Sequence, residues 1–275
     1  MEAVQMAHFA PANRIAQRFV AARLNAMALI DYPGQIPPDL TSAYEVQEAA
    51  IALWPDEIAG WKIGRIPPAL EQKMGAPRLA GPIFRKTVQK ASDDKVVDCP
   101  VFEGGFAAIE AEFVYEIGAD APPGQLRWTL NDAAAIVGRM LVGVEAAGSP
   151  LATINALGPT VVVSDFGNNA GLILGPEVPS WRERTLTDLA AETFIDGKSV
   201  GTGNAASVYG GPLGALQFVA ELCATRGRPL KAGMLISTGA ATGIHDIAIG
   251  QEARIEFKGI GTIRCAATMR DPQSP

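Results

Sequence analysis

Histidine is scarce in this sequence, which contains two, His8 and His245. A histidine-ligated metal centre and most nucleophiles that depend on a Ser-His-Asp or Cys-His arrangement are therefore poor interpretations. The three cysteines, Cys99, Cys223 and Cys265, are far apart and form no paired spacing, which argues against a zinc site and against a disulfide framework. The chemistry is therefore expected to come from carboxylates, in a reducing compartment.

Basic clusters and long apolar runs are missing as well. The net charge is −6 and no group of Lys and Arg is interleaved with aromatic residues, which excludes nucleic acid as an expected partner. No apolar stretch reaches membrane-spanning length, and the first twelve residues lack a basic start followed by an apolar run. With 48% hydrophobic residues the chain can bury a full core, and we expect a cytoplasmic protein that is neither exported nor embedded in a membrane.

What is present is a run of alternating acids. Alternate side chains of a strand share a face, so Glu110 and Glu112 are expected to stand side by side. Two carboxylates that lie so near each other repel unless water screens them, one of them keeps a proton, or a cation lies between them. In a dry site a hard divalent ion such as Mg²⁺ fits oxygen ligands. The alternative is a solvated strand face continued by Glu116, and this stretch alone leaves both interpretations open.

Two further residues are candidates for the same chemistry. Lys62 lies in a short strand-like segment between Trp61 and Ile63, where desolvation would move its pKa toward neutrality and suit proton transfer. Taken alone, this residue is better interpreted as a surface lysine on an edge strand. Glu145 ends an apolar run and is either a third oxygen ligand or an ordinary strand-end acid at the surface.

The N-terminal part is predicted to be helical. Apolar residues at helical spacing predict a first helix over residues 10–29. Ser42, with Glu45 three residues later, predicts a capping box that opens a second helix over residues 42–53.

The later part is predicted to be rich in short strands. A long loop around a short helix is expected over residues 65–84, and a hairpin is expected with its turn at Asp196-Gly197. Helices are expected over residues 132–140 and 212–225. Strands are expected over 96–101, 107–117, 141–145, 161–164, 234–238, 253–257 and 262–268. Regular βαβ alternation is absent, which predicts an α+β fold on a mixed or rolled sheet. We expect a helical N-terminal lobe, 1–58, and a β-rich catalytic domain, 59–275.

Several short motifs, taken in order and spacing, resemble a known family over nearly the whole chain. They are Tyr44-Glu45-Val46-Gln47, Gly60-Trp61-Lys62-Ile63-Gly64, Glu110-Ala111-Glu112, the strand to Glu145, Asn169-Ala170-Gly171-Leu172-Ile173-Leu174-Gly175, Gly211-Pro212-Leu213, Leu230-Lys231-Ala232-Gly233 and Ile236-Ser237-Thr238-Gly239. This pattern is similar to the 2-keto-4-pentenoate hydratase family of the fumarylacetoacetate hydrolase superfamily.

The resemblance implies a rolled mixed β-sheet domain and a metal-dependent hydratase of aromatic catabolism. Such an enzyme adds water to a 2-hydroxy-2,4-dienoate or 2-oxo-enoate and gives a 4-hydroxy-2-oxo acid. The implied cofactor, Mg²⁺ or Mn²⁺, is held by Glu110, Glu112 and Glu145 and chelates the substrate's carboxylate and 2-oxo oxygens. Lys62 matches the family's catalytic lysine.

Substrate contacts are expected from Arg65, Asn169 and Thr238. The Thr238 hydroxyl has the alternative role of satisfying local backbone. Arg65 and Arg78 give a further hypothesis, because paired arginines facing a pocket can hold a second, distal carboxylate. The alternative is that each arginine is a solvated loop residue. The expected partners are a small 2-oxo acid, further copies of this chain and a related decarboxylase.

Two departures from the family pattern affect the hydration step. The family's usual loop acid is absent from Gly75-Ala76-Pro77-Arg78, and amides stand at Asn168 and Asn169 where serines are common. A decarboxylase of the 4-oxalocrotonate type, which needs only an electron sink, therefore remains an alternative. A hydrolase of the same superfamily is disfavoured by the scarcity of histidine. A non-catalytic partner subunit is the alternative from another class.

Overall fold

The computed structural model describes residues 2–92 and 95–272, with side chains from Pro11 onward. Within these residues the strands form two sheets. In spatial order the eight-stranded sheet contains β2 (Arg78–Phe84), β1 (Ile58–Arg65), β10 (Leu235–Ala240), β5 (Phe106–Ile117), β6 (Val137–Ser149), β7 (Asn169–Glu177) and β3 (Val88–Lys90), and β11 (His245–Asp246) also pairs with β5. The five-stranded sheet contains β4 (Val97–Val101), β13 (Gly261–Met269), β12 (Glu252–Phe257), β8 (Ala190–Ile195) and β9 (Lys198–Asn204).

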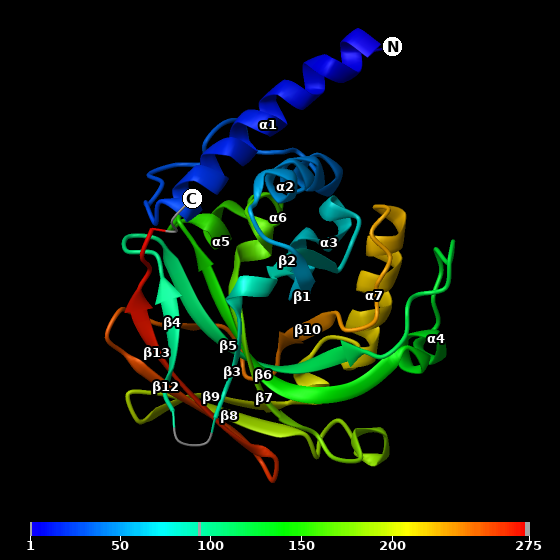
Figure 1. Cartoon of the computed structure of the whole chain (residues 1–275), viewed down its shortest axis with the longest axis vertical. Helices are drawn as coiled ribbons and strands as arrows, with labels where there is room; N and C mark the ends of the chain where they lie inside the picture. The colour runs from blue at the N-terminus through cyan, green and yellow to red at the C-terminus, as the bar shows by residue number, and fades with distance from the viewer. Residues whose placement is uncertain (1, 93–94, 273–275) are drawn as a thin grey trace.

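Helices precede and connect the strands, and the eight-stranded sheet is curled into a half-barrel (Figure 1). The helices are α1 (Glu2–Leu24), α2 (Leu40–Leu53), α3 (Pro68–Met74), α4 (Leu130–Ala135), α5 (Ile154–Leu157), α6 (Pro159–Ser164) and α7 (Gly211–Thr225), with 3-10 turns η1 (Arg85–Thr87), η2 (Phe166–Asn168), η3 (Trp181–Glu183) and η4 (Ala205–Ser207). In Figure 1 the long strands β5 and β6 curve beneath α5 and α6, while α7 lies to one side of the sheet. The predicted α+β fold with a rolled mixed sheet is confirmed.

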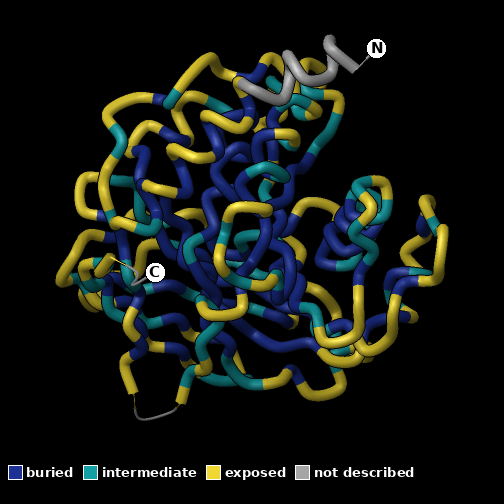
Figure 2. Tube along the Cα trace, turned by 45° about the horizontal axis from the view of Figure 1, so that its top comes forward, coloured by how far each residue is buried: buried dark blue, intermediate teal, exposed yellow. Residues whose placement is uncertain are grey.

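One apolar core joins the helices to both sheets. The buried residues of Figure 2 run from the helical part through the centre of the molecule into the sheets. Phe19 of α1 and Trp61 of β1 are fully buried in this core. Phe113 of β5 contacts Phe257 of β12 edge to face at 5.7 Å between ring centroids, which couples the two sheets.

The buried Gln47 side chain ties α2 to the sheet region. Its amide donates to the backbone oxygens of Ala80, at 3.0 Å, and Val163, at 2.9 Å. The division into a lobe, 1–58, and a catalytic domain, 59–275, stays a proposal.

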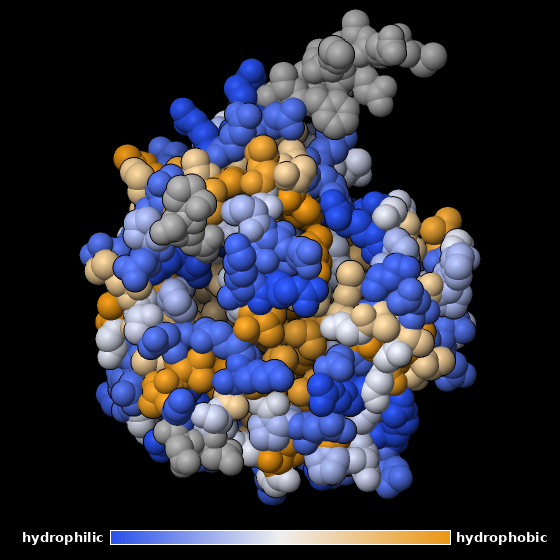
Figure 3. Space-filling view, viewed as in Figure 1, coloured by the Kyte–Doolittle hydropathy of each residue, from blue (hydrophilic) through white to orange (hydrophobic). Residues whose placement is uncertain are grey.

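The surface is mixed in character. Figure 3 shows a face on which hydrophilic residues predominate and apolar residues gather in a hollow near its centre. None of the described helices combines the length and the apolar character needed to cross a bilayer.

Several strands and one turn were predicted correctly, and β4, β12 and β13 show the alternating burial of a strand with one buried face. The strands over 96–101, 107–117, 253–257 and 262–268 are confirmed as β4, β5, β12 and β13. The hairpin turn is confirmed too, because Asp196 (φ 48°) and Gly197 (φ 76°) both adopt the left-handed conformation that a tight turn requires. The helix 212–225 is confirmed as α7.

Short apolar segments were predicted poorly. Residues 161–164 were expected as a strand but belong to the buried helix α6, where Pro159 occupies the first turn. Residues 78–84 were expected in a loop but form β2, which is buried along its whole length. Such segments have no polar face, and without one periodicity does not separate helix from strand.

Helix boundaries were also shifted. The first helix ends at Leu24 rather than 29, and Ala26 has a positive φ of 52°. The carboxylate of Asp39, rather than Ser42, caps α2 and accepts a hydrogen bond from the Ser42 backbone N–H. The helix expected over 132–140 stops at Ala135, because β6 already begins at Val137 to pair with β5.

Candidate active site

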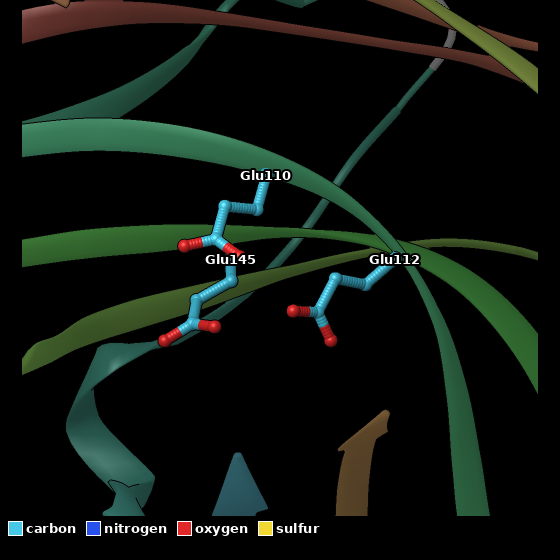
Figure 4. Close-up of side chains that lie close together, drawn as sticks. All are labelled: Glu110, Glu112 and Glu145. Carbon is cyan, nitrogen blue, oxygen red and sulfur yellow. The ribbon is translucent and has the colours of Figure 1, made fainter. Parts of the chain in front are cut away.

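The three glutamates converge from two adjacent antiparallel strands. Glu110 of β5 lies directly opposite Glu145 of β6, and Glu112 follows two residues later on the same face, opposite Gly143. Figure 4 shows their carboxylates pointing toward one another. One oxygen from each carboxylate lies within 4.8 Å of the other two, and all three residues are buried. Such a spacing suits three ligands of one ion.

Glu112 is held in place from its own sheet. Its Oε2 atom accepts hydrogen bonds from the Ser237 hydroxyl, at 2.6 Å, and from the Gly239 N–H, at 2.8 Å, both on β10. The Oε1 atom of Glu112 and the Oε2 atom of Glu145 are buried and have no hydrogen-bond partner within the described residues. Unpartnered buried carboxylate oxygens are costly unless a cation satisfies them.

The pKa values of Glu110 and Glu112 also show that the buried carboxylates disfavour one another's charge. Burial, and then the charge of Glu145, raise the pKa of Glu110 to about 7, although Lys62 opposes the shift. Burial, followed by the charges of Glu145 and Glu110, raises the pKa of Glu112 well above its ordinary value. In the metal-free protein these acids therefore retain protons at pH values where free carboxylates have lost them. A divalent cation would displace those protons.

Lys62 is the cation that faces the cluster. Its Nζ atom lies 3.3 Å from Glu145 Oε1 and donates to Asn168 Oδ1 at 3.0 Å. Burial disfavours its charged form, but Glu145, Glu110 and Glu112 outweigh that effect and raise its pKa. The interpretation as a surface lysine on an edge strand was therefore wrong, because β1 lies between β2 and β10 and Lys62 is buried. Neighbouring charge, which the segment itself does not contain, keeps this lysine an ammonium.

Glu145 is likewise not an ordinary acid at the surface end of a strand. It was considered as an acid at the end of a strand, but β6 continues four residues beyond it to Ser149 and Glu145 is fully buried. Its Oε1 atom accepts from the Asn169 amide at 3.0 Å. Asn169 thus contacts a candidate metal ligand and does not line the cavity.

The turn η2 brings Asn168 to Lys62. Phe166, Gly167 and Asn168 all have positive φ, at 55°, 63° and 56°, which is a costly conformation for the two residues that are not glycine. Gly81 permits the close approach of this turn to β2, since a Cβ there would lie 2.0 Å from the Phe166 oxygen. The Asn168 amide then donates to Asn155 at 3.2 Å and leaves its oxygen for Lys62.

A buried ion pair holds the start of η2. Arg23 of α1 donates from Nε to Asp165 at 2.5 Å and also to the backbone oxygen of Asn169 at 2.9 Å. Ser149 donates to the second oxygen of Asp165 at 2.6 Å. This network attaches the N-terminal helix to the loop that carries Asn168.

A cavity of about 790 Å³ opens beside these groups. It is lined by Lys62 and Glu110 together with Asn168, and also by Arg65 and Arg78. Two arginines that the sequence singled out thus share one cavity with the candidate catalytic lysine.

Thr238 lines the same cavity, but its hydroxyl donates to the Phe113 backbone oxygen at 2.7 Å. Its neighbour Ser237 makes the contact with Glu112. Sequence reasoning did not assign roles to Ser237, Asn155, Arg23 and Asp165. The signal for Ser237 was its place beside Thr238, while the other three act across long sequence separations that no local pattern marks.

The fold and the buried carboxylate cluster define a class: a curled β-sheet protein with a candidate divalent-cation site beside a lysine. No family model matched the chain. The chain is 27% identical over 232 residues to "2-keto-4-pentenoate hydratase 2" of Dechloromonas aromatica (strain RCB), covering 82% of this chain and 85% of the relative. It is 29% identical over 102 residues to a 4-oxalocrotonate decarboxylase of Pseudomonas putida, covering 37% of this chain and 39% of the relative.

Solved structures agree with this picture. A 4-oxalocrotonate decarboxylase from Pseudomonas putida G7, complexed with magnesium and adipate, superposes with a TM-score of 0.76 at 25% identity over 93% of this chain and 97% of that chain. A fumarylpyruvate hydrolase from Pseudomonas aeruginosa, in complex with Mn²⁺ and pyruvate, shares the fold at a TM-score of 0.56 and 15% identity, over 76% and 89% of the two chains. The chain is thus similar to 2-keto-4-pentenoate hydratases, and it shares the fold of the 4-oxalocrotonate decarboxylase, in agreement with the family resemblance noted in the sequence.

Proposed function

We propose that this protein is a metal-dependent hydro-lyase that adds water to a 2-hydroxy-2,4-dienoate, or its 2-oxo-enoate tautomer, and forms a 4-hydroxy-2-oxo acid in the catabolism of aromatic compounds. The observation that carries the proposal is the buried Glu110, Glu112 and Glu145 cluster, with two orphaned oxygens, beside a lysine that faces a cavity.

The donor set fits Mg²⁺ or Mn²⁺. Three carboxylates in a dry site are hard oxygen ligands, and neither histidine nor cysteine contributes to the cluster. When bound, such an ion supplies positive charge that stabilises an enolate oxygen and orients a 2-oxo acid. Which of the two ions is native is left to metal titration.

Lys62 is proposed to move the protons. As an ammonium it gives a proton to C5 of the dienolate, which leaves the conjugated 2-oxo-3-enoate and a neutral amine. That amine accepts a proton from water as the water oxygen bonds to C4, and the ammonium so formed gives this proton to C3. The amine then takes up one proton from solvent, which balances the proton that the 2-hydroxyl group released to solvent when the dienolate formed.

The amides assist by position. Asn168 accepts from Lys62 and is itself held by Asn155, so the ammonium has a fixed direction toward the cavity. Asn169 orients Glu145 from behind. We propose Thr238 and Arg65 as substrate contacts because both line the cavity, with Asn169 acting through Glu145.

Decarboxylation is the second candidate. Glu110 is the one carboxylate among the described residues that line the cavity, so the acid that the hydratases carry on the loop after β1 has no replacement there. Loss of carbon dioxide from a vinylogous 2-oxo acid needs an electron sink but no second acid, so the same groups would serve it. We further propose a cytoplasmic homo-oligomer that associates with a related decarboxylase. A non-catalytic role in such an assembly is the third possibility.

A proton NMR time course in D₂O with Mg²⁺ tests these functions. The substrates are 2-hydroxypenta-2,4-dienoate, its dicarboxylic homologue and 4-oxalocrotonate, each offered separately. We expect a 4-hydroxy-2-oxo acid to appear, and loss of carbon dioxide would instead establish the decarboxylase. Glu145→Gln is the matched control because it keeps the shape of the site and removes one ligand charge. Absence of both products and of deuterium exchange at C3 and C5 would contradict an enzymatic role.

A further inference from the structure

The cavity carries a second charged region, formed by Arg65, Arg78 and the start of α7. Arg65 and Arg78 are opposite one another in the pairing of β1 with β2. Both guanidinium groups lie over the ring of Tyr209, at 3.7 Å for Arg65 and 5.0 Å for Arg78. Tyr209 thus fixes two cations side by side on the cavity wall.

Arg78 has no carboxylate partner within the described residues. It is 8% exposed and donates a hydrogen bond to the backbone oxygen of Tyr209. Burial, and then the charge of Arg65, lower the pKa of this guanidinium. Arg65 differs because it forms an ion pair with Glu71 and donates to Pro77. A buried guanidinium whose charge is uncompensated is a ready site for an anion.

The N-terminus of α7 adds to this positive region. Gly210 is its N-cap residue and no side chain caps the helix. A Cβ added at Gly210 would lie 3.2 Å from Arg78 Nη2, so the guanidinium lies directly at the helix start. The Gly211 N–H already donates to the Val208 oxygen and Pro212 has no N–H, so this end of α7 contributes mainly through the helix dipole, which favours negative charge at the same place.

The separation from the glutamate cluster suits one small molecule. Lys62 and Arg65 are three residues apart on β1, which places their Cα atoms roughly 10 Å apart along the strand. A short carbon chain fits between a 2-oxo acid group held near Lys62 and a second anionic group held at Arg78. Both regions line the same cavity of about 790 Å³.

We propose that Arg78, assisted by Arg65 and the α7 N-terminus, binds a distal carboxylate, so that the substrate is a dicarboxylic 2-oxo or 2-hydroxy-dienoic acid. The inference rests on the proposed function, in which the glutamate cluster and its cation hold the 2-oxo acid end. Arg78 is then a specificity-determining residue that distinguishes dicarboxylic from monocarboxylic substrates.

Calorimetric titration of the 275-residue protein in Mg²⁺ tests the inference with three unreactive ligands. Oxalate represents the chelating end alone, while 2-oxohexanoate and 2-oxoadipate share a six-carbon chain and differ in the distal carboxylate. We expect 2-oxoadipate to bind about tenfold to a hundredfold more tightly than 2-oxohexanoate, as a charge-assisted bidentate contact would provide. Equal binding of the two by the wild-type protein would overturn the inference without any variant.

Arginine-to-glutamine variants test which residue causes the preference for 2-oxoadipate over 2-oxohexanoate. Arg78→Gln should reduce the preference for 2-oxoadipate to nearly one while the affinity for oxalate stays unchanged. Arg65→Gln should reduce it less, because Glu71 already shares that charge. Arg127→Gln, at an exposed arginine away from the cavity, is the matched control and should keep the full preference. A preference that survives in Arg78→Gln would show that Arg78 serves only to hold Tyr209.

Oxalate binding distinguishes failure of the proposed function from failure of the dicarboxylate inference. If oxalate binds and the two longer ligands bind equally, the dicarboxylate inference fails and the proposed function stands. If oxalate does not bind in Mg²⁺, the proposed function fails and the inference falls with it.

Discussion

Two groups of buried charges lie close together in this protein and are built in opposite ways. Arg23 and Asp165 form a pair whose charges cancel and whose hydrogen-bonding groups are shared with Ser149 and the backbone. The three glutamates on β5 and β6 face one lysine, and two of their oxygens have no partner within the described residues. The first group therefore stabilises the fold. The second group lowers the stability of the metal-free fold, and a bound cation can relieve that cost.

Removing half of the balanced pair should have the largest effect. Arg23→Met leaves Asp165 buried without its counterion, and we expect the free energy of unfolding to fall by about 3–5 kcal/mol, as for other broken buried pairs. Urea denaturation followed by circular dichroism measures it. Arg18→Met on the exposed face of the same helix is the matched control, with an expected change under about 0.5 kcal/mol. Similar losses in the two variants would contradict the structural role of the pair.

The unbalanced cluster should respond in the opposite sense. In EDTA at pH 8 we expect the free energy of unfolding of Glu112→Gln to exceed that of the wild type by on the order of 2 kcal/mol, because an acid whose pKa is raised in the folded protein costs stability once the unfolded chain has ionised. Thermal unfolding followed by circular dichroism measures the difference. The gain should shrink as the pH falls toward the ordinary carboxyl pKa and vanish below about pH 3.5, where the acid is protonated in both folded and unfolded chains. With Mg²⁺ the order should reverse, since the variant has lost a ligand.

Glu116→Gln is the control for this comparison. Glu116 lies on the same strand but is partly exposed and pairs with Arg139, so its change should be small and insensitive to Mg²⁺. A destabilised Glu112→Gln in EDTA at pH 8 would refute the view that the cluster is held under strain.

Proton competition acts on the affinity for Mg²⁺ rather than on the stability of the fold. Because the pKa of Glu110 is raised to about 7 and that of Glu112 is raised well above its ordinary value, both hold protons that a cation must displace. The apparent affinity for Mg²⁺ should therefore rise with pH, by up to about tenfold per pH unit for each proton released. Calorimetry at pH 6, 7 and 8 in buffers of different ionisation enthalpy counts those protons. An affinity that does not change across this range would contradict the raised pKa values.

Local patterns predicted part of this molecule correctly. The two-residue spacing of Glu110 and Glu112 placed them on one face, and the Asp196-Gly197 turn placed a hairpin, because both features depend on neighbours in the chain. The apolar segment 161–164 was assigned to a strand because a segment that is buried on every side has no periodicity to read.

The sequence by itself determined the α+β class and the pairing of Glu110 with Glu112 on one strand face. Its resemblance to a known family added Glu145 and Lys62 to the candidate site. Only the tertiary structure decided that β1 is an interior strand, that Lys62 is buried against three carboxylates, and that Arg78 lacks a carboxylate partner within the described residues. Burial and charge pairing arise between residues that are far apart along the chain. Arg23 meets Asp165 across 142 residues, and no local pattern encodes which distant charge a side chain will meet when the sheet curls.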